Sequence, residues 1–173
     1  MSNKLEMKID FFNTNCNSFS SKKEFGLCDD PPPAKNPAYI DEKNGQNWIA
    51  VIENHHQTKV HFVAIDNCIT LKRDDGTDVS KCDGLLYFDD TIIFVELKQR
   101  GGNPKGWKEK AVNQLKETII LFEQQQEAKK FKIKRAYTCN KKVRKSNEKN
   151  QNRMEKFKDD TGYVLSIQQR IEI

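Results

Sequence analysis

Short apolar runs recur along the chain after residue 59, separated by polar segments, and several of them predict a secondary-structure element. Residues 60–71 are rich in β-branched and aromatic residues, which is typical of a strand. Two further runs, 84–88 and 91–97, flank an Asp-Asp pair and predict a hairpin with a two-residue turn. From Lys105 onward the apolar spacing becomes helical, with residues at three- and four-residue steps: Trp107, Ala111, Leu115, Ile119 and Phe122.

The remaining segments are assigned by the same patterns. Residues 39–59 hold one apolar cluster that fits a helix or a strand, and we favour a helix. A strand is predicted at 131–139, a short helix at 152–162 and a terminal strand at 163–173. This order predicts an α/β domain with a central mixed sheet of about five strands flanked by helices on both faces. Residues 1–38 are polar and proline-punctuated, so we expect a loosely ordered arm before a single domain at 39–173.

Charged residues stand at one end of the otherwise apolar hairpin. If Phe88 pairs with Thr91, then Asp83 lies opposite Glu96, and Lys98 projects from the same face of the sheet. Two carboxylates placed opposite each other repel, and a bound cation would compensate. Mg²⁺ commonly takes one or two carboxylates together with waters, and the carbonyl oxygen of Leu97 is a candidate additional ligand. An exposed ion cluster at a strand end is the alternative, and we judge the metal site the better explanation.

These residues resemble the PD-(D/E)xK nuclease superfamily, which includes many restriction endonucleases. The resemblance covers about residues 40–140: "CDG", the apolar hairpin, and "VELK". It implies a restriction-endonuclease-like core and a metal-dependent endonuclease that hydrolyses phosphodiester bonds, with DNA as the expected substrate. Asp83 and Glu96 would hold Mg²⁺ or Mn²⁺, and Lys98 would assist the attack of water. Cys82 stands where the family has proline.

Further candidates surround this motif. Gln114 lies on the apolar side of the long helix, either as a core-edge amide bonded to backbone or beside the metal site. The family also places a glutamate on its first helix as a metal ligand; Glu53 is our candidate for it and Glu42 the reserve. Asp66 is a further possible acid. Three lysines would attract the phosphates of nucleic acid: Lys105, Lys108 and Lys110.

Charge and composition add to this hypothesis. Residues 98–158 contain 19 Lys and Arg against 6 Asp and Glu, a block that fits either a nucleic-acid surface or a solvated basic face. The rival function is a non-catalytic module that binds nucleic acid or a protein partner on the same fold. The superfamily resemblance also makes a homodimer a possible assembly.

The cysteines and the hydropathy of the chain bear on its location. The five cysteines are scattered and lack a CxxC pair, so we expect them to be reduced core residues. Because the sequence has no long apolar run and no apolar signal segment, we expect no membrane association and a cytoplasmic protein.

Overall fold

The central element is a mixed sheet that runs through the middle of the molecule. The computed structural model describes residues 8–99, 106–141 and 150–173. In that part of the chain the sheet has six strands in the order β1-β5-β6-β7-β8-β9. The first four strands of this order pair antiparallel, whereas β7 with β8 and β8 with β9 pair parallel. Their bounds are β1 Asn17–Ser20, β5 Val60–Ala64, β6 Gly84–Phe88, β7 Thr91–Lys98, β8 Ile133–Asn140 and β9 Val164–Ile167. The α/β class and the mixed central sheet are therefore confirmed.

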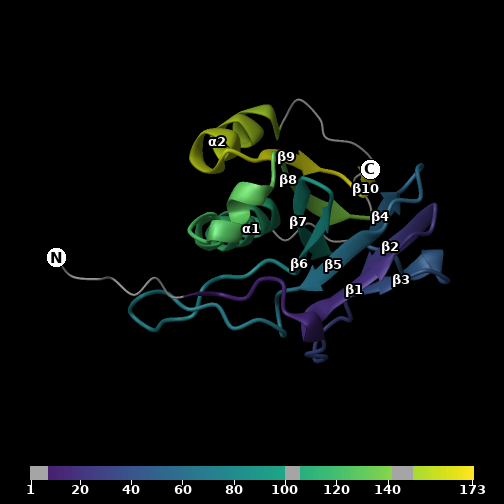
Figure 1. The fold of residues 1–173 in the computed structure, drawn as a ribbon, viewed down its shortest axis with the longest axis horizontal. Helices are drawn as coiled ribbons and strands as arrows, with labels where there is room; N and C mark the ends of the chain where they lie inside the picture. Colours follow the sequence, from purple (N-terminus) through teal and green to yellow (C-terminus); the bar gives the residue numbers. More distant parts are fainter. Residues whose placement is uncertain (1–7, 100–105, 142–149) are drawn as a thin grey trace.

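The two faces of this sheet carry different layers. One face is covered by α1 (Trp107–Glu123) and α2 (Gln151–Thr161), and the other by a second, four-stranded sheet in the order β10-β4-β2-β3 (Figure 1). The strands of this second sheet are β2 Glu24–Cys28, β3 Tyr39–Asp41, β4 Ala50–Glu53 and β10 Arg170–Glu172. The expectation of helices on both faces was wrong, because a sheet covers one of them.

Successive side chains of the hairpin point to opposite faces of the main sheet, and this alternation explains the three layers. Leu85 and Phe94 pack with Phe122 of α1, whereas Leu86 and Ile93 pack against the second sheet. Both faces of β6 and β7 are therefore buried, as expected of strands at the centre of a layered domain. The pairing Leu85 with Phe94 and Phe88 with Thr91 confirms the predicted hairpin register.

The region expected to be a helix, residues 39–59, forms β3, the short 3-10 helix η2 (Gly45–Asn47) and β4 instead. The residues from Trp48 to Ile52 are buried without interruption. Such a continuous apolar run suits a strand that is covered on both faces, and its periodicity cannot distinguish that strand from a buried helix. The predicted terminal strand is likewise divided, because β9 belongs to the main sheet and β10 to the second.

The segment 1–38, which we expected to be a loosely ordered arm, is built into both sheets from residue 8 onward. It contributes β1 to the main sheet and β2 to the second sheet, and the 3-10 helix η1 (Thr14–Cys16) directly precedes β1. Phe11 is buried against Phe122. The apolar positions of this segment are few, but several of them, including Phe11, Phe25 and Leu27, pack into cores that are made mainly by distant parts of the chain.

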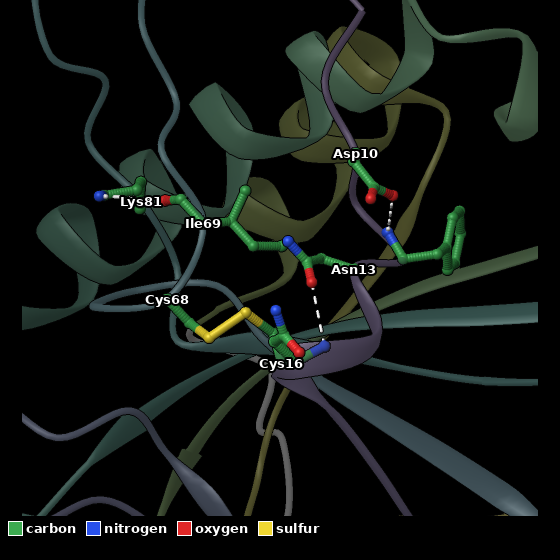
Figure 2. Close-up of a disulfide and its surroundings, with 8 residues drawn as sticks. Asp10, Asn13, Cys16, Cys68, Ile69 and Lys81 are labelled. Atoms are coloured by element: carbon green, nitrogen blue, oxygen red, sulfur yellow. Dashed lines mark hydrogen bonds between the residues drawn. A yellow bond between two sulfur atoms is a disulfide. The ribbon is translucent and has the colours of Figure 1, made fainter.

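A disulfide joins Cys16 to Cys68, which corrects the expectation that all cysteines are reduced (Figure 2). Cys16 precedes β1 and Cys68 follows β5, and these two strands are paired neighbours. Tertiary pairing thus brings together two cysteines that are 52 residues apart. The other three cysteines are free and buried, as expected of small core residues.

Two further features complete the fold. A 3-10 helix, η3 (Gln126–Lys130), connects α1 to β8. Within the described ranges, neither helix has the length and apolar character needed to cross a bilayer.

Candidate metal and catalytic site

The charged end of the hairpin forms a compact, buried cluster. Asp83 immediately precedes β6, and Glu96 lies near the end of β7. The Asp83 backbone N–H donates to Glu96 Oε2 at 3.2 Å, and the Leu97 N–H donates to Asp83 Oδ2 at 2.6 Å. The exposed fractions of Asp83 and Glu96 are only 7% and 2%. The two acids predicted to face each other therefore do so, and both are withdrawn from solvent.

Lys98 extends this cluster toward the surface. Its Nζ lies 2.7 Å from Glu96 Oε1, and 26% of its side chain is exposed. The same ammonium donates to Gln114 Oε1 at 3.2 Å. Gln114 in turn donates through Nε2 to the Lys81 carbonyl oxygen at 3.1 Å. Both alternatives considered for Gln114 are thus realised together, because its amide bonds to backbone and also touches the site.

Helix α1 is tied to the start of the hairpin by a second contact. The Cys82 N–H donates to Thr118 Oγ1 at 2.9 Å, and the Thr118 hydroxyl donates to the Gln114 carbonyl oxygen at 2.8 Å. A proline at position 82 would have no N–H to donate. The cysteine that replaces this proline therefore has a structural use, because the hydrogen bond from its N–H ties the residue before Asp83 to the helix that carries Gln114.

Burial disfavours the charged forms of both acids, and for Asp83 the charge of Glu96 adds to this effect. The pKa of Asp83 is raised well above its ordinary value, first by burial and then by the charge of Glu96. Burial likewise raises the pKa of Glu96 from 4.5 to about 7, although the neighbouring Lys98 opposes this shift. One lysine thus faces two buried carboxylates, and an added cation would stabilise the ionised pair.

The donor set of this pair fits a hard divalent ion. Both acids offer oxygen atoms, which Mg²⁺ and Mn²⁺ prefer, and Mg²⁺ usually takes only one or two carboxylates from the protein. Over the described ranges, no group of three or more His, Cys, Asp or Glu residues is arranged to hold a metal ion. Any cation here would therefore rely on Asp83 and Glu96, with water or substrate oxygens completing its shell.

Two other acids lie within electrostatic reach of the cluster. Asp66, already considered from the sequence, raises the pKa of Glu96. Asp29 raises the pKa of Asp83, and its own pKa is raised by burial and by Asp66 but lowered by Lys98. Sequence reasoning missed Asp29 because it belongs to the segment expected to be a loose arm. Its only local signal was its position directly after the apolar run of β2.

Glu53 and Glu42 lie elsewhere. Glu53 ends β4 in the second sheet, where it forms an ion pair with Arg170. Glu42 follows β3 and accepts a hydrogen bond from the Ser20 hydroxyl at 2.7 Å. The structure does not bring Glu53 to the metal side of the site, because the helix that was expected to carry it is a strand on the opposite face of the main sheet.

The remaining candidates are backbone and basic groups. The Leu97 side chain is buried between the two sheets, and the role of its carbonyl oxygen stays a prediction. Lys108 donates to Asn150 Oδ1 at 3.3 Å, and Lys110 is exposed one turn before Gln114. Lys105 lies outside the described residues. Contact of these lysines with phosphates likewise stays a prediction.

No family model, no curated protein and no solved structure compared with this chain matches it. The chemistry of the Asp83–Glu96–Lys98 cluster is therefore the basis for a functional assignment.

Proposed function

We propose that this protein is a metal-dependent endonuclease of the PD-(D/E)xK type, which hydrolyses phosphodiester bonds in DNA. The observation that carries the proposal is the convergence of three groups. Asp83 and Glu96 are linked through the 3.2 Å hydrogen bond, and Lys98 lies 2.7 Å from Glu96. Two buried acids and one adjacent, partly exposed lysine at the end of two central strands are costly to maintain, and they match the needs of phosphodiester hydrolysis.

Asp83 and Glu96 would hold Mg²⁺ or Mn²⁺, which when bound supplies Lewis-acid stabilisation of phosphate charge and lowers the pKa of water. The hydrogen bond from Leu97 N–H orients the Asp83 carboxylate, so its position is set before a ligand arrives. Lys98 carries a positive charge at the solvent-facing side of the pair, where it can orient water or stabilise charge developing on a phosphate.

Gln114 has a positioning role in this proposal. Its Oε1 accepts from Lys98, and its Nε2 is held by the Lys81 carbonyl. The amide is thus fixed at both ends and limits the rotamers open to Lys98. Restricting a long, flexible side chain in this way lowers the entropy cost of placing its ammonium at the reacting phosphate.

The charge distribution supports nucleic acid as the substrate. The block of 19 basic against 6 acidic residues begins at Lys98 itself and includes α1, which packs beside the site. Lysines of this block would neutralise DNA phosphates, and the counterions of those phosphates would be released. The affinity of the protein for DNA should therefore decrease steeply as the salt concentration rises. We extend the proposal to Lys105, Lys108 and Lys110 as phosphate-contacting residues and to a homodimer as a possible assembly for cutting two strands.

Cleavage of supercoiled plasmid tests the proposal. Wild-type protein should nick or linearise the plasmid with Mg²⁺ or Mn²⁺ and be inactive with EDTA, and Lys98→Ala should lose at least about a hundredfold of this rate. Lys134→Ala is the matched control, because this lysine lies at the opposite end of β7 and β8 and pairs with Glu123. Equal rates in wild type and Lys98→Ala would refute the assignment.

Calorimetry with Mn²⁺ separates the enzyme from the non-catalytic alternative. We expect wild type to bind Mn²⁺ and Asp83→Asn to bind it much more weakly, since the substitution removes one of two anionic ligands. Binding of DNA without metal binding and without cleavage would instead identify a module that binds nucleic acid.

A further inference from the structure

The hydroxyl of Thr138 is a buried polar atom with no partner. Within the described ranges, Thr138 Oγ1 is the one buried side-chain nitrogen or oxygen that makes no hydrogen bond. The residue is 0% exposed. Because an unpaired buried hydroxyl costs free energy that a valine of the same shape would avoid, the position calls for an explanation.

Strand pairing places this hydroxyl beside the proposed metal site. Thr138 on β8 is the register partner of Glu96 on the parallel strand β7. Two residues earlier on each strand, Phe94 and Ala136 are also partners, and both pack in the core beneath α1. Side chains two residues apart on a strand share a face. Thr138 and Glu96 therefore project from the same face of the sheet.

The neighbours of Thr138 on β8 support this orientation. Tyr137 and Cys139 both pack in the core between the two sheets, so the residue between them points the other way. Glu96 on β7 thus lies between Asp83, which immediately precedes the neighbouring strand β6, and Thr138 on the other neighbouring strand, β8. The unpaired hydroxyl lies on the side of Glu96 away from Asp83.

Each oxygen of Glu96 already has one partner. Oε1 is held by Lys98 and Oε2 by the Asp83 N–H. A threonine hydroxyl can both donate and accept a hydrogen bond, and it suits a water molecule as well as a carboxylate. Mg²⁺ and Mn²⁺ retain several waters when proteins bind them through few carboxylates, so a cation held by Asp83 and Glu96 would present such waters.

We propose that Thr138 is a positioning residue of the metal site, whose hydroxyl hydrogen-bonds to the hydration shell of the divalent cation held by Asp83 and Glu96. This inference rests on the proposed function and adds a residue to it. Groups that orient the shell around a metal typically contribute about 10- to 100-fold in affinity or activity. The unpaired hydroxyl is kept because it gains its partner when the ion binds.

Thr138→Val and Thr138→Ser test this role by calorimetry with Mn²⁺ and by urea unfolding of the metal-free protein. Valine keeps the shape and removes the hydroxyl, whereas serine keeps the hydroxyl. We expect Thr138→Val to weaken Mn²⁺ binding about tenfold and Thr138→Ser to restore affinity to near the wild-type value. Without metal, Thr138→Val should be at least as stable as wild type, because it loses an unpaired polar group.

Thr91→Val is the matched control. Thr91 is also buried, at 4% exposed, but it lies at the opposite end of β7 from Glu96. Its replacement should leave the affinity for Mn²⁺ unchanged.

Three results would overturn the inference. Equal Mn²⁺ affinity in wild type and Thr138→Val would remove the role of the hydroxyl while leaving the proposed function intact. If Thr138→Val and Thr138→Ser both bound Mn²⁺ more weakly than wild type and were also less stable without metal, the role of Thr138 would be in packing and not in positioning the hydration shell. Absence of Mn²⁺ binding by wild type would reject the proposed metal site and the role of Thr138 together.

Discussion

Replacing Glu96 with glutamine is expected to stabilise the metal-free protein at alkaline pH. Burial raises the pKa of Glu96 from 4.5 to about 7 in the folded state. A carboxyl whose pKa is raised by folding binds its proton more tightly in the folded state. Its favourable contribution to the free energy of unfolding is therefore complete at pH values below the pKa that it has in the unfolded state. That contribution is lost as pH rises through the folded pKa. Ionised Glu96 therefore destabilises the fold in the absence of a cation.

The size of the effect follows from the two pKa values. Between about pH 5 and about pH 8, a shift from 4.5 to about 7 reduces the free energy of unfolding by about 2.5 kcal/mol. This is a large part of the roughly 5–15 kcal/mol that stabilises a typical domain. Glutamine resembles the protonated acid and does not ionise, so Glu96→Gln should lack this component of the pH dependence.

Urea unfolding at the two pH values, in EDTA, measures the difference. The decrease in free energy of unfolding from acidic to alkaline pH should be smaller by about 2 to 3 kcal/mol in Glu96→Gln than in wild type. Glu155→Gln provides the control, because Glu155 is exposed on α2 and should not alter the pH profile. Identical profiles for wild type and Glu96→Gln would refute the reasoning that burial disfavours the ionised acid.

Addition of Mn²⁺ at the alkaline pH then links stability to the site. A cation that binds only the folded protein stabilises it in proportion to the logarithm of its concentration relative to Kd. Wild type should therefore gain stability with Mn²⁺, and Glu96→Gln should gain much less. A similar gain in both proteins would indicate that the ion binds away from Glu96.

Three other predictions address the surroundings of the site. Gly84→Ala should lower the unfolding free energy by about 1–3 kcal/mol in urea melts, because a Cβ there would lie 2.5 Å from the Phe62 ring; unchanged stability would mean that the ring moves freely. Cys16→Ser should cost about 4 kcal/mol in the same assay without reductant, since the bond to Cys68 closes a loop of 52 residues; an equal effect of reductant on wild type and variant would argue against the disulfide. Glu53→Gln should leave Mn²⁺ affinity and plasmid cleavage at wild-type values, because Glu53 pairs with Arg170 in the second sheet. A loss of either property would indicate that Glu53 is a metal ligand after all.

The hairpin shows how much of the site can be predicted from local sequence. A two-residue turn at Asp89-Asp90 defines the pairing of β6 and β7, and the period of two along each strand then determines which side chains share a face. Asp83, Glu96 and Lys98 all lie within one continuous stretch of the chain. Their convergence could therefore be predicted with no knowledge of the rest of the fold.

Gln114 was predictable in part, because the helical period placed it on the buried side of α1. Its partners were not, since they depend on how the helix packs across the sheet. The contact with Lys98 and the bond to the Lys81 carbonyl both require α1 to lie directly over the end of the hairpin.

The second sheet and the surroundings of the site depend on contacts between distant segments. A continuous apolar run such as 48–52 is compatible with a strand or a helix, and its partner β2 lies in a polar, proline-flanked region. Asp29 approaches the site only because β2 joins that sheet. Thr138 lies beside Glu96 only because β8 pairs parallel to β7 after the chain has passed through α1. Local patterns thus predict the cluster of Asp83, Glu96 and Lys98, whereas strand order across the sheets determines what surrounds it, since strands that pair by hydrogen bonds can come from distant parts of the chain.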